Sequence, residues 1–134
     1  DEIIYMLNHK SGLLGLSGIS PDMRDVRESD SDRAQLARNI FINRIVRYVG
    51  SYIAEMGGVD GIIFTAGIGE HDMGVREAVM DAFKYMGVDP DYEANNKISE
   101  GFITKPDSKV KVMVIPTNEE LMIERDVVRL THIN

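Results

Sequence analysis

The chain has 134 residues, 43% of them hydrophobic and 28% charged, a composition ordinary for one globular domain with its own core. A formal net charge of −7 argues against a broad nucleic-acid surface, and the absence of cysteine excludes disulfides, thiolate catalysis and cysteine-ligated metals. No apolar run approaches the roughly 20 residues of a membrane span. We therefore expect a cytoplasmic protein without nucleic-acid or membrane partners. The chain opens on Asp1 without an initiator methionine, and we expect it to be a piece of a longer protein.

The first 28 residues predict short elements. Apolar residues at mixed helical spacing predict a helix over 2–8. Residues 10–20 hold three glycines among leucines and serines, which predicts a compact, partly buried connection. Ser20 as a cap and Pro21 at the first helical position predict the next helix start.

Two charged residues in that predicted first turn interact oppositely with the helix dipole. Asp22 complements the helix dipole, whereas a cation at Arg24 is mildly unfavourable there. Arg24 can pair with Asp22, Asp25 or Glu28, or it can reach a ribose or phosphate.

A long helix is predicted from Asp32 to about Met56, after a polar break with a second capping site at 29–32. Its expected apolar face consists of Leu36, Ile40, Ile42, Ile45, Val46, Val49, Ile53 and Met56. Four arginines among these residues (33, 38, 44 and 47) indicate a solvated face more often than a binding patch. Gly57 and Gly58 end the helix.

The stretch 61–70 is the strongest candidate for a ligand loop. A short apolar strand leads into Gly67-Ile68-Gly69, and a helix is predicted over 73–86. Glycine permits close backbone approach, and a helix start offers free N–H groups that suit a nucleotide. The stretch is neither a dinucleotide fingerprint nor a Walker A loop. A plain tight connection explains the same residues, so the spacing alone leaves both interpretations open.

The last third of the chain predicts a second strand and helix. Residues 89–97 are polar, 102–104 predict a short extended piece, and 106–108 predict a turn. An apolar strand follows over 109–115 and stops at Pro116. Thr117 and Glu120 have the spacing of a capping box, which opens a helix to about Leu130.

The two strand–turn–helix units, 62–86 and 110–130, predict an α/β protein. Ligands of such sheets sit beyond the carboxyl ends of the strands, so 67–70 and 117–120 are expected to be neighbours on one rim. There Glu119 either faces a metal carried by a nucleotide or complements the helix N-terminal charge.

Four segments together resemble the C-terminal part of the acetate kinase family, in the family's order and over essentially the whole chain. They are Leu7-Asn8 with Ser11-Gly12-Leu13-Leu14-Gly15-Leu16-Ser17-Gly18, Asp22-Met23-Arg24-Asp25-Val26, Phe64-Thr65-Ala66-Gly67-Ile68-Gly69-Glu70, and Pro116-Thr117-Asn118-Glu119-Glu120-Leu121. That family belongs to the superfamily of acetate and sugar kinases, heat-shock ATPases and actin. The resemblance implies an α/β, ribonuclease H-like fold with a mixed sheet and packed helices. It also implies that residues 1–134 are a single C-terminal, nucleotide-side domain portion of a two-domain kinase.

The function implied by the resemblance is reversible phosphoryl transfer from ATP to acetate, giving acetyl phosphate and ADP, with Mg²⁺ and in a homodimer. The nucleotide-binding residues that it implies are Asp22, Met23 and Arg24 near the adenosine, and Gly67, Ile68, Gly69, Glu70 and His71 in the second segment. Glu119 is implied to be the carboxylate associated with Mg²⁺. The family often has asparagine where this chain has His71.

The family's catalytic asparagine, arginines, aspartate, histidine and phosphate-binding glycine loop all precede the segment that Asp1 begins. We therefore expect no catalytic residue in this chain and no activity of the chain alone. A propionate kinase of the same family is the nearest alternative, with Ala66 tilting slightly toward acetate. A different class of function is a non-catalytic nucleotide-binding or dimerisation module, in which the predicted helix 32–56 forms part of the interface. Alone, the piece is expected to expose apolar surface.

Overall fold

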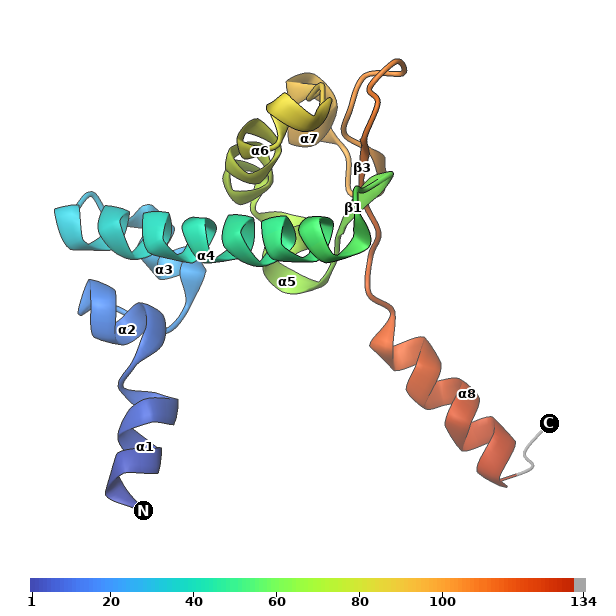
Figure 1. The fold of residues 1–134 in the computed structure, drawn as a ribbon. Coiled ribbons are helices and arrows are strands. Elements are labelled where there is room, and N and C mark those ends of the chain that lie inside the picture. Colours follow the sequence, from blue (N-terminus) through green and yellow to red (C-terminus); the bar gives the residue numbers. More distant parts are fainter. Residues whose placement is uncertain (132–134) are drawn as a thin grey trace.

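The computed structural model describes residues 1–131 as a helical body around a small sheet, from which the first and last helices project (Figure 1). The elements are α1 (Glu2–His9), α2 (Gly12–Ser17), α3 (Met23–Glu28), α4 (Asp32–Met56), β1 (Gly61–Phe64), α5 (Ala66–His71), α6 (Met73–Ala82), the 3-10 helix η1 (Lys84–Met86), α7 (Tyr92–Lys97), β2 (Gly101–Phe102), β3 (Lys111–Val114) and α8 (Glu119–Thr131). No helix in this part of the chain is long and apolar enough to cross a bilayer.

The sheet has the strand order β1-β3-β2. β1 pairs in parallel with β3, placing Phe64 opposite Val114, and β2 pairs antiparallel to β3. The expected mixed sheet with packed helices is confirmed. Because β1 and β3 are parallel, their carboxyl ends meet at one edge, and the segments that follow them begin side by side.

Two hydrophobic clusters support this edge. The larger one joins β3 to α6, with Val112, Val114, Val79 and Met80 almost fully buried. The smaller one joins α3 to the first turns of α4 and includes Val26. α4 runs across the body past both clusters (Figure 1), so it fixes α3 relative to the sheet.

The long helix has the predicted bounds but a partly different buried face. The Ser31 hydroxyl caps α4 by accepting from Ala34 N at 3.1 Å, and Gly57 closes it in the left-handed conformation. The prediction was wrong for Leu36 and Met56, which are 53% and 64% exposed. Ala34 and Ala37 are buried instead, because α2 and α3 pack on the side of the helix where these small side chains admit close approach.

Three predictions of local structure near the N-terminus need correction. The connection 10–20 contains the short helix α2, which ends at Gly18 with a φ of 72°. Asp22 caps α3 in place of Ser20, whose hydroxyl accepts from Asp22 N at 3.1 Å. Pro21 therefore lies before the helix, because the Asp22 carboxylate reaches the next free N–H groups better than a residue two positions earlier.

The middle of the chain is also more helical than predicted. The expected Gly-x-Gly turn is the helix α5, which follows directly on β1. The single helix predicted over 73–86 divides into α6 and η1. The polar stretch 89–97 contains α7, whose Asp91 cap accepts from Ala94 N at 2.9 Å.

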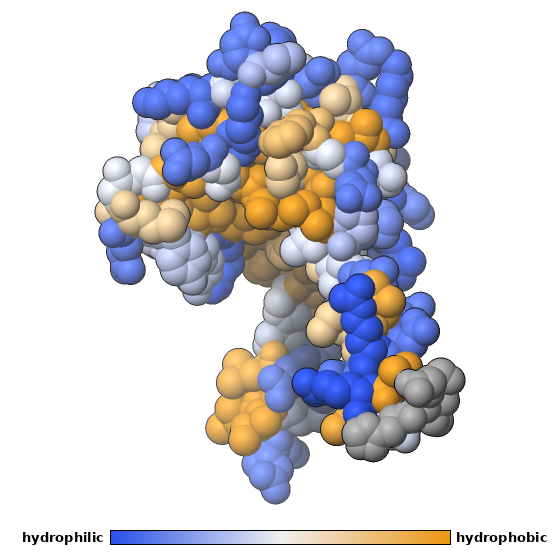
Figure 2. Space-filling model, turned by 90° about the vertical axis from the view of Figure 1, so that its right-hand side faces the viewer, coloured by the Kyte–Doolittle hydropathy of each residue, from blue (hydrophilic) through white to orange (hydrophobic). Residues whose placement is uncertain are grey.

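The two projecting helices contain no buried residue. Asn118 caps α8 by accepting from Leu121 N at 3.1 Å, so the predicted cap at Thr117 was wrong. Hydrophobic side chains lie exposed on α8 and on one face of the body (Figure 2), among them Ile63, Met122, Ile123 and Leu130. The expected exposure of apolar surface is confirmed for the chain by itself.

Candidate nucleotide site

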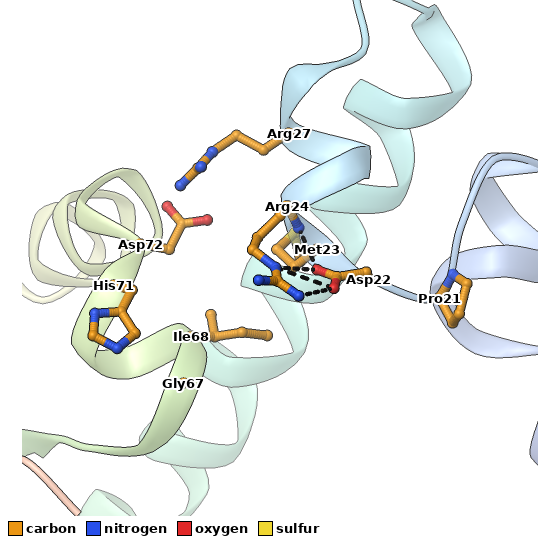
Figure 3. Close-up of a pocket in the computed structure, with 9 residues that line it drawn as sticks. All are labelled: Pro21, Asp22, Met23, Arg24, Arg27, Gly67, Ile68, His71 and Asp72. Atoms are coloured by element: carbon orange, nitrogen blue, oxygen red, sulfur yellow. Dashed lines mark hydrogen bonds and ion pairs between the residues drawn. The ribbon is translucent and has the colours of Figure 1, made fainter.

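A pocket of about 440 Å³ opens between α3 and the α5–α6 junction (Figure 3). It is lined by Pro21, Asp22, Met23, Arg24, Arg27, Gly67, Ile68, His71 and Asp72. The first five belong to α3 and its approach, and the last four follow β1. Two of the four sequence motifs therefore lie on opposite walls of one pocket.

The α3 wall presents a charged pair over an apolar base. Arg24 N donates to the Asp22 carboxylate at 2.8 Å, and the Arg24 guanidinium donates to both of its oxygens, the shortest distance being 2.6 Å. These hydrogen bonds lower the pKa of Asp22 to about 2. Of the partners open to Arg24, the structure selects Asp22. Met23 is 5% exposed and anchors the turn in the smaller cluster.

The opposite wall comes from α5. Apart from its chain neighbours and the backbone of its own helix, no atom lies within 4 Å of where a Cβ of Gly67 would be, so the space above its backbone is free for a ligand. Ile68 packs against both hydrophobic clusters, which fixes α5 on the body. His71 and Ile68 face the Asp22–Arg24 pair across the pocket (Figure 3). This wall thus combines open backbone, an apolar side chain and an imidazole.

A second pocket of about 340 Å³ adjoins the first at Gly67. Its lining residues are Ala66, Gly67, Glu70, Thr117, Asn118, Glu119 and Glu120. The predicted neighbourhood of 67–70 and 117–120 on one rim is confirmed. Gly69 lines neither pocket, because it packs against Phe64 on the core side.

The rim is held by hydrogen bonds between residues about 50 positions apart. Glu70 Oε1 accepts from Thr117 N at 2.8 Å, and Thr117 Oγ1 accepts from Ala66 N at 3.0 Å. The hydroxyls of Thr117 and Thr65 share a hydrogen bond of 2.7 Å. The Thr117 N–H holds the pKa of the Glu70 carboxyl below its usual range. Glu70 is thus an ionised acceptor that joins the segment after β3 to the helix after β1.

The donor set of the second pocket suits a hard divalent cation. Beside Glu70, whose carboxylate accepts from Thr117 N, Glu119 and Glu120 supply carboxylate oxygens, the ligands that Mg²⁺ prefers. Residues 1–131 hold no group of three or more metal-ligating side chains able to bind an ion alone. This arrangement fits an Mg²⁺ that takes one carboxylate from the protein and its other ligands from phosphates and water.

A buried arginine behind α5 was missed by the sequence analysis. Arg76 is 1% exposed and donates to the carbonyl oxygens of Gly69 and Glu70 at 3.0 and 2.6 Å. It also donates to the side-chain and main-chain oxygens of Asn95 at 2.8 and 2.7 Å. Burial lowers its pKa, although an arginine stays charged in proteins. Arg76 therefore satisfies the last carbonyls of α5 and ties the candidate loop to α7.

One of the four arginines of α4 is not solvated as expected. Arg38 is paired with Asp72 at 3.2 Å, and the two side chains are 22% and 6% exposed. Asp72 also caps α6 by accepting from Val75 N at 3.0 Å. Arg27 points from α3 toward Asp72 across the first pocket (Figure 3). The sequence does not predict that Arg27, Arg38 and Asp72 lie near one another, because they come from three separate parts of the chain.

The profile of the Acetokinase family matches residues 1–125, and thereby spans all four motifs and both walls of the site. The chain belongs to the acetokinase family. An acetate kinase of Shouchella clausii is 54% identical over 136 residues, covering 98% of this chain and 34% of the relative. The chain thus spans about a third of the length of the curated acetokinases that it matches.

Solved structures of acetokinases support the same conclusion for the fold. The acetate kinase of Porphyromonas gingivalis matches with a TM-score of 0.87 and 42% identity over 96% of this chain and 34% of that one. A propionate kinase of Francisella tularensis matches with a TM-score of 0.80 and 40% identity over 91% of this chain and 32% of that one. The expected α/β, ribonuclease H-like class is confirmed, because the chain has the fold of the corresponding part of these kinases.

Proposed function

We propose that residues 1–134 form the C-terminal, nucleotide-side domain portion of an acetate kinase. The reaction is the reversible transfer of a phosphoryl group from ATP to acetate, which gives acetyl phosphate and ADP. The observation that carries this proposal is the pair of adjoining pockets that share Gly67. One has the mixed apolar and polar walls that suit a nucleoside, and the other has the carboxylates that suit a phosphate-bound Mg²⁺.

In this proposal the first pocket binds the adenosine. Met23 and Ile68 supply apolar contact, and Asp22, Arg24 and His71 supply polar groups around it. The open space at Gly67 lets the nucleotide pass close to the backbone on its way to the second pocket. Because Arg24 is already held by Asp22, it needs little further ordering when a ligand arrives.

Glu119 is the proposed Mg²⁺ ligand of the second pocket. Bound Mg²⁺ neutralises charge on the phosphates during transfer. Glu119 lies in the first turn of α8 without a hydrogen bond or ion pair to another described residue, so its carboxylate is available. The residues of this chain thus bind and orient the nucleotide. The groups that act on the transferred phosphoryl group belong, in this proposal, to the rest of a complete kinase, and the chain alone is inactive.

Two alternatives keep their own supporting observations. A propionate kinase is favoured by the match to the Francisella tularensis enzyme, and rates of the complete kinase on acetate and propionate separate the two substrates. A dimerisation module is favoured by α4, where Tyr48 and Tyr52 are more than half exposed. We also propose that the complete kinase is a cytoplasmic homodimer. Sedimentation at several protein concentrations tests whether it dimerises.

The proposal is tested by a chimera in which this chain replaces the matching third of the Shouchella clausii acetate kinase. We expect the chimera to form acetyl phosphate and the isolated chain to form none. In the chimera, Arg24→Ala should raise the KM for ATP about tenfold, the effect of losing one charge-assisted hydrogen bond. Arg47→Ala, at an exposed position of α4 that lines neither pocket of the site, is the matched control and should leave that KM unchanged. A folded chimera whose KM for ATP is equally insensitive to both substitutions contradicts the assignment of the first pocket.

A further inference from the structure

The segment that carries Glu119 is hydrogen-bonded to the rest of the described structure through one residue, Thr117. Within residues 1–131, the hydrogen bonds that connect positions after β3 and Ile115 to another element all involve Thr117. α8 itself has no buried residue. The position of Glu119 relative to α5 therefore depends on how Thr117 is held.

Thr117 is held at both its main chain and its side chain. Its N–H donates to Glu70 Oε1 at 2.8 Å, and its hydroxyl contacts Thr65 and Ala66 N. Ala66 has a φ of 58°, a left-handed conformation that a residue with a Cβ adopts at some cost. The hydrogen bond from Ala66 N to Thr117 helps to stabilise this conformation. The contact therefore shapes the start of α5 as well as the approach to α8.

We propose that Glu70 is a positioning residue, which places Glu119 opposite the nucleotide loop by holding Thr117, and that it does not itself bind the nucleotide or its metal. This inference rests on the proposed function, since it takes Glu119 as the Mg²⁺ ligand. It revises the role that family resemblance implies for Glu70. We name Thr65, Ala66, Glu70 and Thr117 together the rim clasp.

The clasp acts through a short connection. Two peptide units separate Thr117 from Glu119, and Pro116 precedes Thr117 with its fixed φ. A shift of the Thr117 backbone therefore moves the Glu119 carboxylate by a similar amount. Residues that orient metal ligands without touching the metal typically change metal affinity or activity by about 10–100-fold when they are removed.

The test measures the Mg²⁺ concentration for half-maximal rate in the complete kinase that contains this chain. Glu70→Ala removes the acceptor for Thr117 N, and we expect it to raise that concentration about tenfold while the KM for acetate stays the same. Glu70→Gln keeps an oxygen acceptor but no charge, and we expect it to stay within about threefold of the unaltered kinase. If Glu70→Gln is as impaired as Glu70→Ala, the carboxylate acts by charge on the ligand, and the proposal is wrong.

The second half of the clasp provides an independent test. Thr117→Val removes the hydroxyl at nearly constant shape and should raise the Mg²⁺ requirement as Glu70→Ala does. Thr117→Ser keeps the hydroxyl and should leave the requirement near that of the unaltered kinase. This pair tests the hydroxyl contacts of the clasp with Thr65 and Ala66, and Glu70→Gln keeps the role of Glu70 testable even if Glu70→Ala fails to fold. Equal Mg²⁺ requirements of Thr117→Val and Thr117→Ser would refute the hydroxyl half of the clasp. Thermal unfolding of each variant shows whether the effect is local.

A variant of Glu119 separates failure of the clasp from failure of the proposed function. Glu119→Gln should weaken the Mg²⁺ response strongly, and adding Glu70→Ala to it should have little further effect because both act at one ligand. If Glu119→Gln leaves the response unchanged, the metal assignment itself is wrong. If it weakens the response and Glu70→Ala does not, only the clasp is refuted.

Discussion

At the scale of single residues, the Asp22–Arg24 pair has a measurable protonation signature. Hydrogen bonds from Arg24 lower the pKa of Asp22 to about 2, so the carboxylate should remain ionised at pH 4, where an ordinary aspartate is about half protonated. The pair is thus present above the ordinary pKa and is lost as the pH falls toward 2. Carboxyl carbon NMR of the chain measures this midpoint. In Arg24→Ala the midpoint should return to the ordinary range, and an unchanged midpoint would contradict the assigned cause.

The roles of individual residues differ in how far the sequence could predict them. Asp22, Met23, Arg24, Gly67 and His71 line a pocket as their motifs suggested. Glu70 stands in the same motif but accepts from Thr117, 47 residues away. The sequence cannot tell whether Glu70 binds a ligand or holds another residue in place, because a carboxylate that follows a glycine can do either. The motif gives the place of a residue on the rim, and only the fold gives its partner.

At the scale of elements, Arg76 is expected to set the stability of the α5–α6–α7 unit. Arg76→Met removes the donor to the part-buried carbonyls of Gly69 and Glu70 and to the buried oxygens of Asn95, and should cost about 3 kcal/mol of unfolding free energy. Arg47→Met, on an exposed helix face, should cost less than about 0.5 kcal/mol. Urea unfolding followed by circular dichroism compares them. Equal midpoints for the two variants would show that the Arg76 network does not support the fold.

The elements themselves were predictable where their causes are local. The bounds of α4 followed from a serine cap and a glycine stop. The strands followed from apolar runs. α5 was missed because two glycines in six residues disfavour a helix, and its ends are satisfied by Thr117 and Arg76 from elsewhere in the chain. In the sequence Arg76 looks like a solvent-exposed arginine of an amphipathic helix, because its buried partner Asn95 lies 19 residues away.

At the scale of the whole molecule, the body and the two projecting helices should differ in local stability. No residue of α1 or α8 is buried, whereas α6 and β3 lie in the core. Backbone amides of the two projecting helices should therefore exchange with solvent far faster than those of α6 and β3. Hydrogen exchange read by mass spectrometry tests this on the isolated chain. Protection of α8 equal to that of α6 would contradict it. In the proposed complete kinase, we expect α1 and α8 to gain protection.

The parallel pairing of β1 with β3 has a consequence for synthesis of the protein. Gly61 pairs with Lys111, and every element from α5 to β2 lies between these two strands in the chain. On a translating ribosome, which releases the chain from its N-terminus onward, α2, α3 and α4 can pack on one another early. β1 must then wait, with its backbone unpaired on that side, until β3 emerges. The nucleotide loop thus acquires its native shape only after β3 and Thr117 have emerged, and a nascent chain stalled before Thr117 would carry the motif without the site.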